Sequence, residues 1–420
     1  MIAIVDCNNF YVSCERIFNP KLENIPVVVL SNNDGCAVAR SNEAKKIGIK
    51  MRQPFFEIEH LLITHKGVAL SSNYALYADM SNRVMKILYD IAPKQEIYSI
   101  DECFLSFQGM TKEDTEKRLI EAIKRVKQWT GLPISVGVGK TKTEAKIAVY
   151  LAKSYPKRFK SYCNIYDFDE STRDEIYKMI DVSEIWGVGR KLTERMHKLR
   201  IQNIYQLKTI NKLMLEKNFN VNVKKTVLEI NGTSCISIEE IPKKKQIMFS
   251  RSFKEHLTTL ESVSEAVSTF CERSMEKLRY QHSYCQTATV YIATNRFGPN
   301  PYSNSYSIPF QATNDTLVVV KKCLAALKNI FLENQEYSKV GVILSNITST
   351  QIIKTSLFEE IDEERIKKNK RLMKFLDKIN YEKTGLIKLA SSGTDNKLSS
   401  SQIRRSPQYT TQKKDILKIK

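Results

Sequence analysis

The chain has 420 residues, of which 42% are hydrophobic and 27% charged, as is typical of a soluble globular protein and not of a disordered or collagen-like one. This length predicts several domains. The sequence contains no run of about 18 apolar residues, so no membrane span is expected. Because 66 Lys and Arg outnumber 46 Asp and Glu, the net charge is +20, which favours a polyanionic partner such as nucleic acid.

The cysteines and the first residues indicate the compartment. Nine cysteines are scattered along the sequence without a C-x-x-C pair, which argues against a disulfide framework or a zinc site. The sequence starts with a short apolar segment that contains Asp6 and lacks the basic leader of a secretory signal. We therefore expect a reducing, cytoplasmic environment and no membrane partner.

Hydrophobic periodicity predicts an alternation of strands and helices in the first 140 residues. In chain order, we expect a strand at 2–6, a helix at 74–91, strands at 96–100 and 103–107, a helix at 113–129 and a strand at 133–138. This order is that of the ferredoxin-like βαββαβ fold. Residues 24–71 interrupt it and are predicted to form an inserted subdomain.

This topology brings distant acidic residues together. The first and third strands of a ferredoxin-like sheet are antiparallel neighbours, so Asp6 should lie beside the turn that contains Asp101 and Glu102. Such carboxylates repel one another unless cations neutralise them, and Mg²⁺ prefers oxygen ligands. Two Mg²⁺ ions, with the Cys7 main-chain carbonyl as a further ligand, would support phosphoryl or nucleotidyl transfer. The alternative is an acidic turn that is merely solvated.

Side chains near these acids could bind a nucleotide. Phe10 and Tyr11 follow the first strand, and a flat ring there could exclude a 2′-hydroxyl, although adjacent aromatics are also common core residues. Lys45 and Lys153 belong to segments that adjoin the carboxylates, and are candidates for contacting phosphate. Most lysines, however, are simply solvated.

The rest of the chain is predicted to bind DNA. Residues 166–241 are helical, and Gly187 and Gly189 precede Arg190 at a helix start, where backbone N–H groups can bind a DNA phosphate or form an ordinary turn. Residues 246–346 repeat the strand–helix–strand–strand–helix–strand order without an acidic pair at the central turn. In the basic tail, Leu357 and Phe358 are either a docking peptide or an anchor to the chain itself.

Several segments together resemble the Y-family translesion DNA polymerases, and most closely their UmuC branch. The resemblance covers nearly the whole chain, and its motifs are residues 6–11 (DCNNFY), 13–15 (SCE), 26–40 (PVVVLSNNDGCAVAR), 71–85 (SSNYALYADMSNRVM), 96–102 (EIYSIDE), 135–142 (SVGVGKTK), 185–190 (IWGVGR) and 406–411 (SPQYTT).

The resemblance implies a right-handed polymerase with α+β architecture. Its domains would be a ferredoxin-like palm (1–23 and 72–165), small fingers (24–71), a helix-hairpin-helix thumb (166–241), a βαββαβ little finger (242–346) and a basic tail (347–420). By position, Asp6 and Asp101 match the metal-binding aspartates, Glu102 the catalytic glutamate, Tyr11 the steric gate and Lys153 a triphosphate contact. Gly187 to Gly189 match the thumb motif, and Leu357 with Phe358 the end of a sliding-clamp peptide.

Two positions depart from the family pattern. Asn42 and Lys45 stand where many members have a Tyr and an Arg that hold the triphosphate, and UmuC-type sequences share this departure. A lysine is a point charge that cannot make the bidentate contact of an arginine. Lys354 stands where the clamp peptide normally begins with Gln.

These observations predict an error-prone, template-directed DNA polymerase that acts in the SOS response to DNA damage. Its substrates would be primer-template DNA and a deoxynucleoside triphosphate, and its cofactor two Mg²⁺ ions. The resemblance also implies a sliding clamp, a UmuD-type subunit and a recombinase filament as partners. The alternatives are a non-catalytic DNA-binding repair subunit and a nucleotidyl cyclase, which can use a similar sheet with paired acids.

Overall fold

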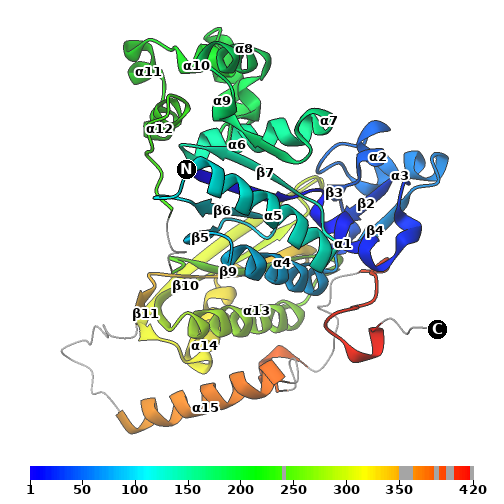
Figure 1. The fold of residues 1–420 in the computed structure, drawn as a ribbon. Coiled ribbons are helices and arrows are strands. Elements are labelled where there is room, and N and C mark those ends of the chain that lie inside the picture. The colour runs from blue at the N-terminus through cyan, green and yellow to red at the C-terminus, as the bar shows by residue number, and fades with distance from the viewer. Residues whose placement is uncertain (239–242, 350–362, 383–386, 394–401, 417–420) are drawn as a thin grey trace. The chain divides into compact units, whose positions relative to one another are not determined.

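The computed structural model describes residues 1–238, 243–349, 363–382, 387–393 and 402–416. The chain divides into two compact units (Figure 1). The first comprises Met1–Ile241 together with Gln402–Lys420, and the second comprises Pro242–Ser401. Among the described residues, no helix has the length and apolar character that a membrane span requires.

A five-stranded sheet is the centre of the first unit. Its strands are β1 (Ile2–Cys7), β5 (Lys94–Ile97), β6 (Glu102–Ser106), β7 (Ile134–Gly139) and β8 (Tyr162–Asn164). The strand order is β5-β6-β1-β7-β8, so that β1 is antiparallel to both β6 and β7. The predicted ferredoxin-like topology, with the first and third strands adjacent, is therefore confirmed.

The turn between β5 and β6 is longer than predicted. β5 ends at Ile97, and Glu102 is the first residue of β6 and not part of the turn. The backbone N–H groups of Tyr98 and Ser99 both donate to the Glu102 carbonyl, each at 3.1 Å, which closes the turn. The alternation of hydrophobic residues could not reveal where β5 ends, because the apolar pattern of the strand continues into the turn.

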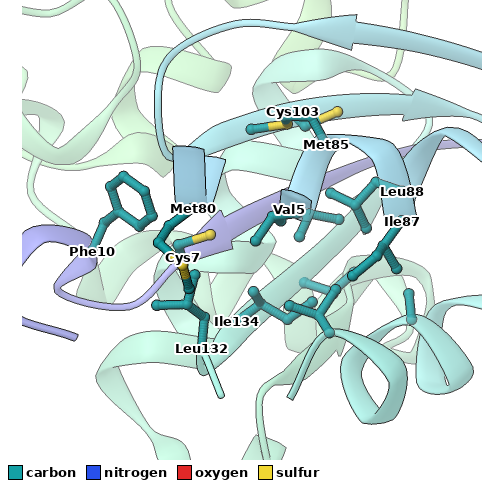
Figure 2. Packing of buried hydrophobic residues seen from close by; sticks show 14 of the residues in the cluster. Val5, Cys7, Phe10, Met80, Met85, Ile87, Leu88, Cys103, Leu132 and Ile134 are labelled. Atoms are coloured by element: carbon teal, nitrogen blue, oxygen red, sulfur yellow. The ribbon is translucent and has the colours of Figure 1, made fainter. Parts of the chain in front are cut away.

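Helices cover both faces of this sheet. Helices α4 (Tyr74–Tyr89) and α5 (Lys112–Thr130) pack on the face that carries Val5 and Cys7. Figure 2 shows this core, in which α4 contributes Met80, Met85, Ile87 and Leu88. Ile4 points to the opposite face and packs with α6 (Lys142–Ser154). Because side chains alternate along a strand, Asp6 is on the α6 face.

The inserted region is a small sheet with short helices. Its elements are β2 (Val27–Leu30), β3 (Ala37–Arg40), α2 (Asn42–Lys46), α3 (Phe55–Thr64) and β4 (Val68–Ser71). Helix α1 (Phe10–Phe18) precedes this region and packs in the core of the central sheet. The strand order is β3-β2-β4. Residues of β2, including Val28 and Leu30, form a separate apolar core with α2 and α3, so this region has its own hydrophobic support.

A helical region follows α6. Its helices are α7 (Pro156–Phe159), α8 (Glu170–Met179), α9 (Arg190–Lys198), α10 (Ile204–Lys208), α11 (Lys212–Asn218) and α12 (Val221–Ile230). Glu229 on α12 is fully buried and accepts hydrogen bonds from the backbone N–H and the hydroxyl of Thr143, at 3.0 and 2.8 Å. Glu229 thereby ties α12 to the first turn of α6.

The second unit has the predicted strand and helix order. Its elements are β9 (Ile247–Leu257), α13 (Leu260–Tyr280), β10 (Ser283–Thr294), β11 (Ser303–Thr313), α14 (Thr316–Lys328), β12 (Tyr337–Ser345), β13 (Thr348–Ser349) and α15 (Glu363–Glu382). The spatial order of its main strands is β11-β10-β12-β9, all antiparallel. This differs from the order in the first unit, although the order along the chain is the same.

Candidate active site

The register of β1 against β6 brings the predicted acids together. Asp6 lies directly opposite Glu102 in the antiparallel pair. The backbone N–H of Cys7 donates to the carbonyl of Asp101 at 2.9 Å, so the ladder continues into the turn. Two residues that are 96 positions apart in sequence thus become neighbours, as the topology predicts.

Two lysines of α6 neutralise these acids. Lys146 Nζ is 2.6 Å from Glu102 Oε1, and Lys153 Nζ forms an ion pair with Asp6 Oδ1. The sequence interpretation includes Lys153 but misses Lys146. A signal for Lys146 exists, because Lys142, Lys146 and Lys153 are four and seven residues apart and therefore share one face of a helix.

Burial disfavours the charged forms of these carboxylates. Asp6 is only 8% exposed. Burial raises the pKa of Asp6, and the neighbouring Glu102 adds to the rise, while Lys153 acts in the opposite direction. Burial also acts against the charged form of Glu102, but Lys146, the Asp6 carboxyl and Lys153 outweigh it, so that the pKa of Glu102 is lowered. The site therefore holds negative charge only where a cation is close.

Asp101 is in the turn that precedes β6 and not in the strand itself. Its Oδ1 accepts a hydrogen bond of 2.6 Å from the Ser99 hydroxyl, which holds the carboxylate in place. Asp101 and Asp6 both line a cavity of about 320 Å³. In the part of the chain that the structure describes, no three Asp, Glu, His or Cys side chains converge on one point as a preformed metal site.

The cavity adjoins both the central sheet and the inserted region. Residues of β1, α1, β3, α2 and α6 contribute to its wall, among them Cys7, Phe10, Tyr11, Arg40, Lys45 and Lys153. Its wall thus carries both carboxylates and cationic side chains. Such a pairing suits a ligand that combines a phosphate chain with a metal ion.

Tyr11 is held by other tyrosines. Its ring stacks on Tyr77 of α4, with the centroids 4.3 Å apart and the planes 14° from parallel, and meets Tyr74 edge-on at 6.2 Å. Burial raises the pKa of Tyr11 to about 12, so its hydroxyl stays neutral. Phe10 is 3% exposed and belongs to the core in Figure 2, although it also borders the cavity.

Lys45 is directed by two asparagines. Its Nζ donates to Asn9 Oδ1 at 2.7 Å, and Asn9 in turn donates to Asn42 Oδ1 at 3.0 Å. Arg40 Nη1 donates to the Ile49 carbonyl at 2.6 Å, but its buried Nε has no hydrogen-bond partner in the structure. Lys45 and Arg40 thus present cationic groups to the cavity from a fixed backbone.

The thumb motif is exposed. Gly187 has a φ of 87°, a conformation that favours glycine. Gly189 is the N-cap of α9, and the Arg190 side chain is 88% exposed at the start of that helix. The sequence interpretation misses Trp186, whose indole N–H donates to the Tyr98 hydroxyl at 2.9 Å and so ties the motif to the β5–β6 turn. Leu357 and Phe358 lie outside the described residues.

Comparison with known proteins identifies three matching regions. Residues 5–150 match the impB/mucB/samB family, and residues 244–357 match the C-terminal domain of that family. Residues 370–419 match a domain of unknown function, DUF4113.

Similar proteins cover the whole chain. Protein ImpB of Salmonella typhimurium is 39% identical over 99% of both chains. Protein UmuC of Salmonella typhimurium is 35% identical over 100% of both. DNA polymerase IV of Corynebacterium diphtheriae is 27% identical over 85% of this chain and 77% of its own.

Solved structures show the same fold. A Y-family DNA polymerase chimera of Dbh and Dpo4 superimposes with a TM-score of 0.65 and 19% sequence identity, covering 83% of this chain and all of its own. Together with the sequence matches, this fold shows that the chain belongs to the impB/mucB/samB family of proteins, which have the fold of Y-family DNA polymerases.

Proposed function

We propose that this protein is an error-prone DNA polymerase that copies damaged templates in the SOS response. The primer 3′-hydroxyl attacks the α-phosphate of the incoming deoxynucleotide, and pyrophosphate leaves. The observation that carries this proposal is the β1–β6 register, which sets Asp6 opposite Glu102 beside a cavity of about 320 Å³ that Asp101 also lines. The membership in a family with DNA polymerase relatives supports the same reading.

Asp6, Asp101, Glu102 and the Cys7 carbonyl would hold two Mg²⁺ ions. The donors fit, because all are hard oxygen ligands, and because the buried Asp6 and the half-buried Glu102 lie opposite each other and already pair with ammonium groups. The ions would supply charge stabilisation for the attacking and leaving oxygens. Lys146 helps to lower the pKa of Glu102, Lys153 opposes the rise that burial causes in the pKa of Asp6, and the Ser99 hydroxyl orients Asp101.

The cavity wall would orient the nucleotide. Lys45 and Lys153 would contact its phosphates, and Phe10 would support the backbone at the start of α1. Tyr11 would pack against the sugar and exclude a 2′-hydroxyl. Its stacking on Tyr77 supports this role, because a gate must hold its position to discriminate one oxygen atom.

DNA would bind mainly through phosphates. The backbone near Gly187 and Gly189 and the exposed Arg190 would contact one strand. The net charge of +20 supports further phosphate contacts from the second unit, and binding should weaken steeply with salt. We assign the central sheet with α4, α5 and α6 to the palm (1–23 and 72–165), and residues 24–71, 166–241 and 242–346 to fingers, thumb and little finger.

Partners and location follow from the relatives. The full-length match to protein UmuC supports a UmuD-type subunit and a recombinase filament as partners, in the cytoplasm. A sliding clamp would bind the peptide that contains Leu357 and Phe358. These assignments rest on the family and not on the described residues.

A primer-extension assay tests the proposed reaction. Asp101→Ala/Glu102→Ala should lower extension at least about a hundred-fold, because preorganised charge stabilisation is lost. The matched control is Glu113→Ala/Asp114→Ala, an exposed acidic pair in the first turn of α5, which should extend normally. Extension across an abasic template site then tests lesion bypass.

Three outcomes would contradict the proposal. Equal extension by both double variants would remove the acids from the reaction. DNA binding without any extension by the wild-type protein, in the presence of Mg²⁺ and accessory proteins, would favour a non-catalytic repair subunit. A cyclic nucleotide product would favour a cyclase.

A further inference from the structure

The C-terminal segment of the chain packs on the first unit, next to the candidate active site. Residues 402–416, which we name the C-terminal brace, belong to the same compact unit as β1 and α4 and are coloured red in Figure 1. They contain the motif Ser406–Thr411, to which the proposed function gives no role. They also lie inside the matched domain of unknown function, residues 370–419.

The brace binds the junction between β4 and α4 through its backbone. The N–H of Ser71 donates to the Arg404 carbonyl at 3.1 Å, and the N–H of Arg404 donates to the Ser71 hydroxyl at 3.0 Å. Asn73 Nδ2, at the start of α4, is within 2.9–3.2 Å of the Ser406 hydroxyl, the Ser406 carbonyl and the Pro407 carbonyl. Ser71 and Asn73 are buried, so these contacts are built into the fold.

A second contact anchors the brace on α1. The Tyr409 ring stacks on Phe18, the last residue of α1, with the centroids 4.8 Å apart and the planes 8° from parallel. Arg404 lies over the Phe55 ring of α3, with its guanidinium carbon 4.7 Å from the ring centroid. The brace therefore contacts α1 and α3 as well as the start of α4.

These contacts meet at one buried carboxylate. Glu15 of α1 is 1% exposed, and its Oε1 accepts hydrogen bonds from the Ser406 hydroxyl at 3.0 Å and the Tyr77 hydroxyl at 2.7 Å. Tyr77 is the ring on which Tyr11 stacks. Burial raises the pKa of Glu15, while the hydrogen bonds from Tyr77 and Ser406 act in the opposite direction. Both donors therefore stabilise the ionised form of Glu15.

We infer that the C-terminal brace positions the sugar-discriminating ring: Ser406 holds Glu15, Glu15 holds the Tyr77 hydroxyl, and Tyr77 fixes Tyr11 by stacking. This inference rests on the proposed role of Tyr11. Ser406, Glu15 and Tyr77 are positioning residues, because Tyr11 alone would touch the nucleotide. The C-terminal brace thus acts as part of the nucleotide-selection machinery, although it is more than 390 residues from Tyr11 in sequence.

The test measures discrimination and not only activity. Full-length Ser406→Ala is compared with the wild type for the efficiency of incorporating dCTP and rCTP opposite template guanine. We expect rCTP efficiency to rise about five- to tenfold, as loss of one buried hydrogen bond loosens Tyr11. The dCTP efficiency should change less than the rCTP efficiency. A substitution that merely destabilised the protein would lower the dCTP and rCTP efficiencies together.

Matched variants sharpen the result. Ser406→Thr and Glu15→Gln keep the hydroxyl and the accepting oxygen, and should discriminate as the wild type does, whereas Glu15→Ala should resemble Ser406→Ala. Gln412→Ala removes an exposed side chain of the same segment and should change nothing. Fluorescence of Trp129 and Trp186 confirms that each variant is folded.

Tyr11→Ala separates the inference from the proposal on which it rests. If Tyr11→Ala admits rCTP but Ser406→Ala discriminates like the wild type, the brace has no positioning role while the gate remains. If Tyr11→Ala itself keeps full discrimination, the gate assignment is wrong and the brace has nothing to position. A parallel fall of both efficiencies in Ser406→Ala would also overturn the inference.

Discussion

The two units of this protein arrange the same order of elements in different ways. Along the chain, both have the order strand, helix, strand, strand, helix, strand. In the first unit, β1 lies between β6 and β7. In the second, β9 pairs with β12 and stands at the edge of the described sheet. The first strand is therefore central in one unit and peripheral in the other.

This difference explains why the end of β1 is enclosed and the end of β9 is not. A central strand has a neighbour on each side, so the end of β1 is enclosed and Asp6 is 8% exposed opposite Glu102. Near the end of β9, the consecutive residues Lys254, Glu255 and His256 are all exposed. A carboxylate at an edge is solvated and needs no cation, whereas one at an enclosed strand end does. Three predictions test this contrast.

The largest effect is expected for the acid at the end of the first strand. Asp6→Asn should lower primer extension at least about a hundred-fold, because the substitution keeps the shape but removes the charge that pairs with Lys153. Glu255→Gln makes the same chemical change on β9 and should leave extension within about twofold, since exposed charges contribute little. Steady-state primer extension measures both. Comparable losses in the two variants would show that enclosure of the strand end does not matter.

The next effect concerns a glycine on β7 in the first unit and one on β12 in the second. A Cβ on Gly137 of β7 would collide with the backbone of Ala145 and Val149 in α6, which cannot move aside. Gly137→Ala should therefore destabilise the first unit by about 3 kcal/mol. A Cβ on Gly341 of β12 would meet the ring of Tyr291, which can rotate, so Gly341→Ala should cost only about 1 kcal/mol.

Two probes separate these glycine effects. Both tryptophans, Trp129 and Trp186, are in the first unit, so urea unfolding followed by their fluorescence reports Gly137→Ala. Calorimetry reports Gly341→Ala. An unfolding midpoint for Gly137→Ala equal to that of the wild type would refute the close approach of α6 to β7, which places Lys146 and Lys153 at the acids.

The smallest effect is expected for the threonine that begins a helix in each unit. Thr141 is buried, accepts from the Glu144 N–H at 3.1 Å and donates to the Glu229 carbonyl at 2.9 Å. Thr141→Ala should therefore cost about 2 kcal/mol. Thr259 is exposed, and its hydroxyl caps α13 by accepting a hydrogen bond from the backbone N–H of Ser262. Thr259→Ala should therefore lower the free energy of unfolding by only about 0.5–1 kcal/mol. Calorimetry of both variants measures the two losses of stability. A larger loss for Thr259→Ala than for Thr141→Ala would contradict the prediction.

Much of the candidate site could be predicted from local sequence and topology. The apolar strand that ends at Asp6 and the acidic pair at Asp101 and Glu102 are sequence signals, and the ferredoxin-like order places them together. The only sequence signal for the pairing of Lys146 with Glu102 is the helical spacing of the lysines in α6. The stacking of Tyr77 on Tyr11 had no such signal, since helical periodicity indicates a buried face but not which ring it meets.

The sequence by itself determined the local elements, the net charge and the residue types available for chemistry, because alternation, periodicity and capping act between residues close in the chain. Tertiary structure alone decided that the same order of elements gives a different strand order in the second unit, why β1 is enclosed and β9 is not, and that Ser406 reaches Glu15 across 391 positions. These contacts depend on the packing of whole faces, and one order of elements is compatible with more than one such packing.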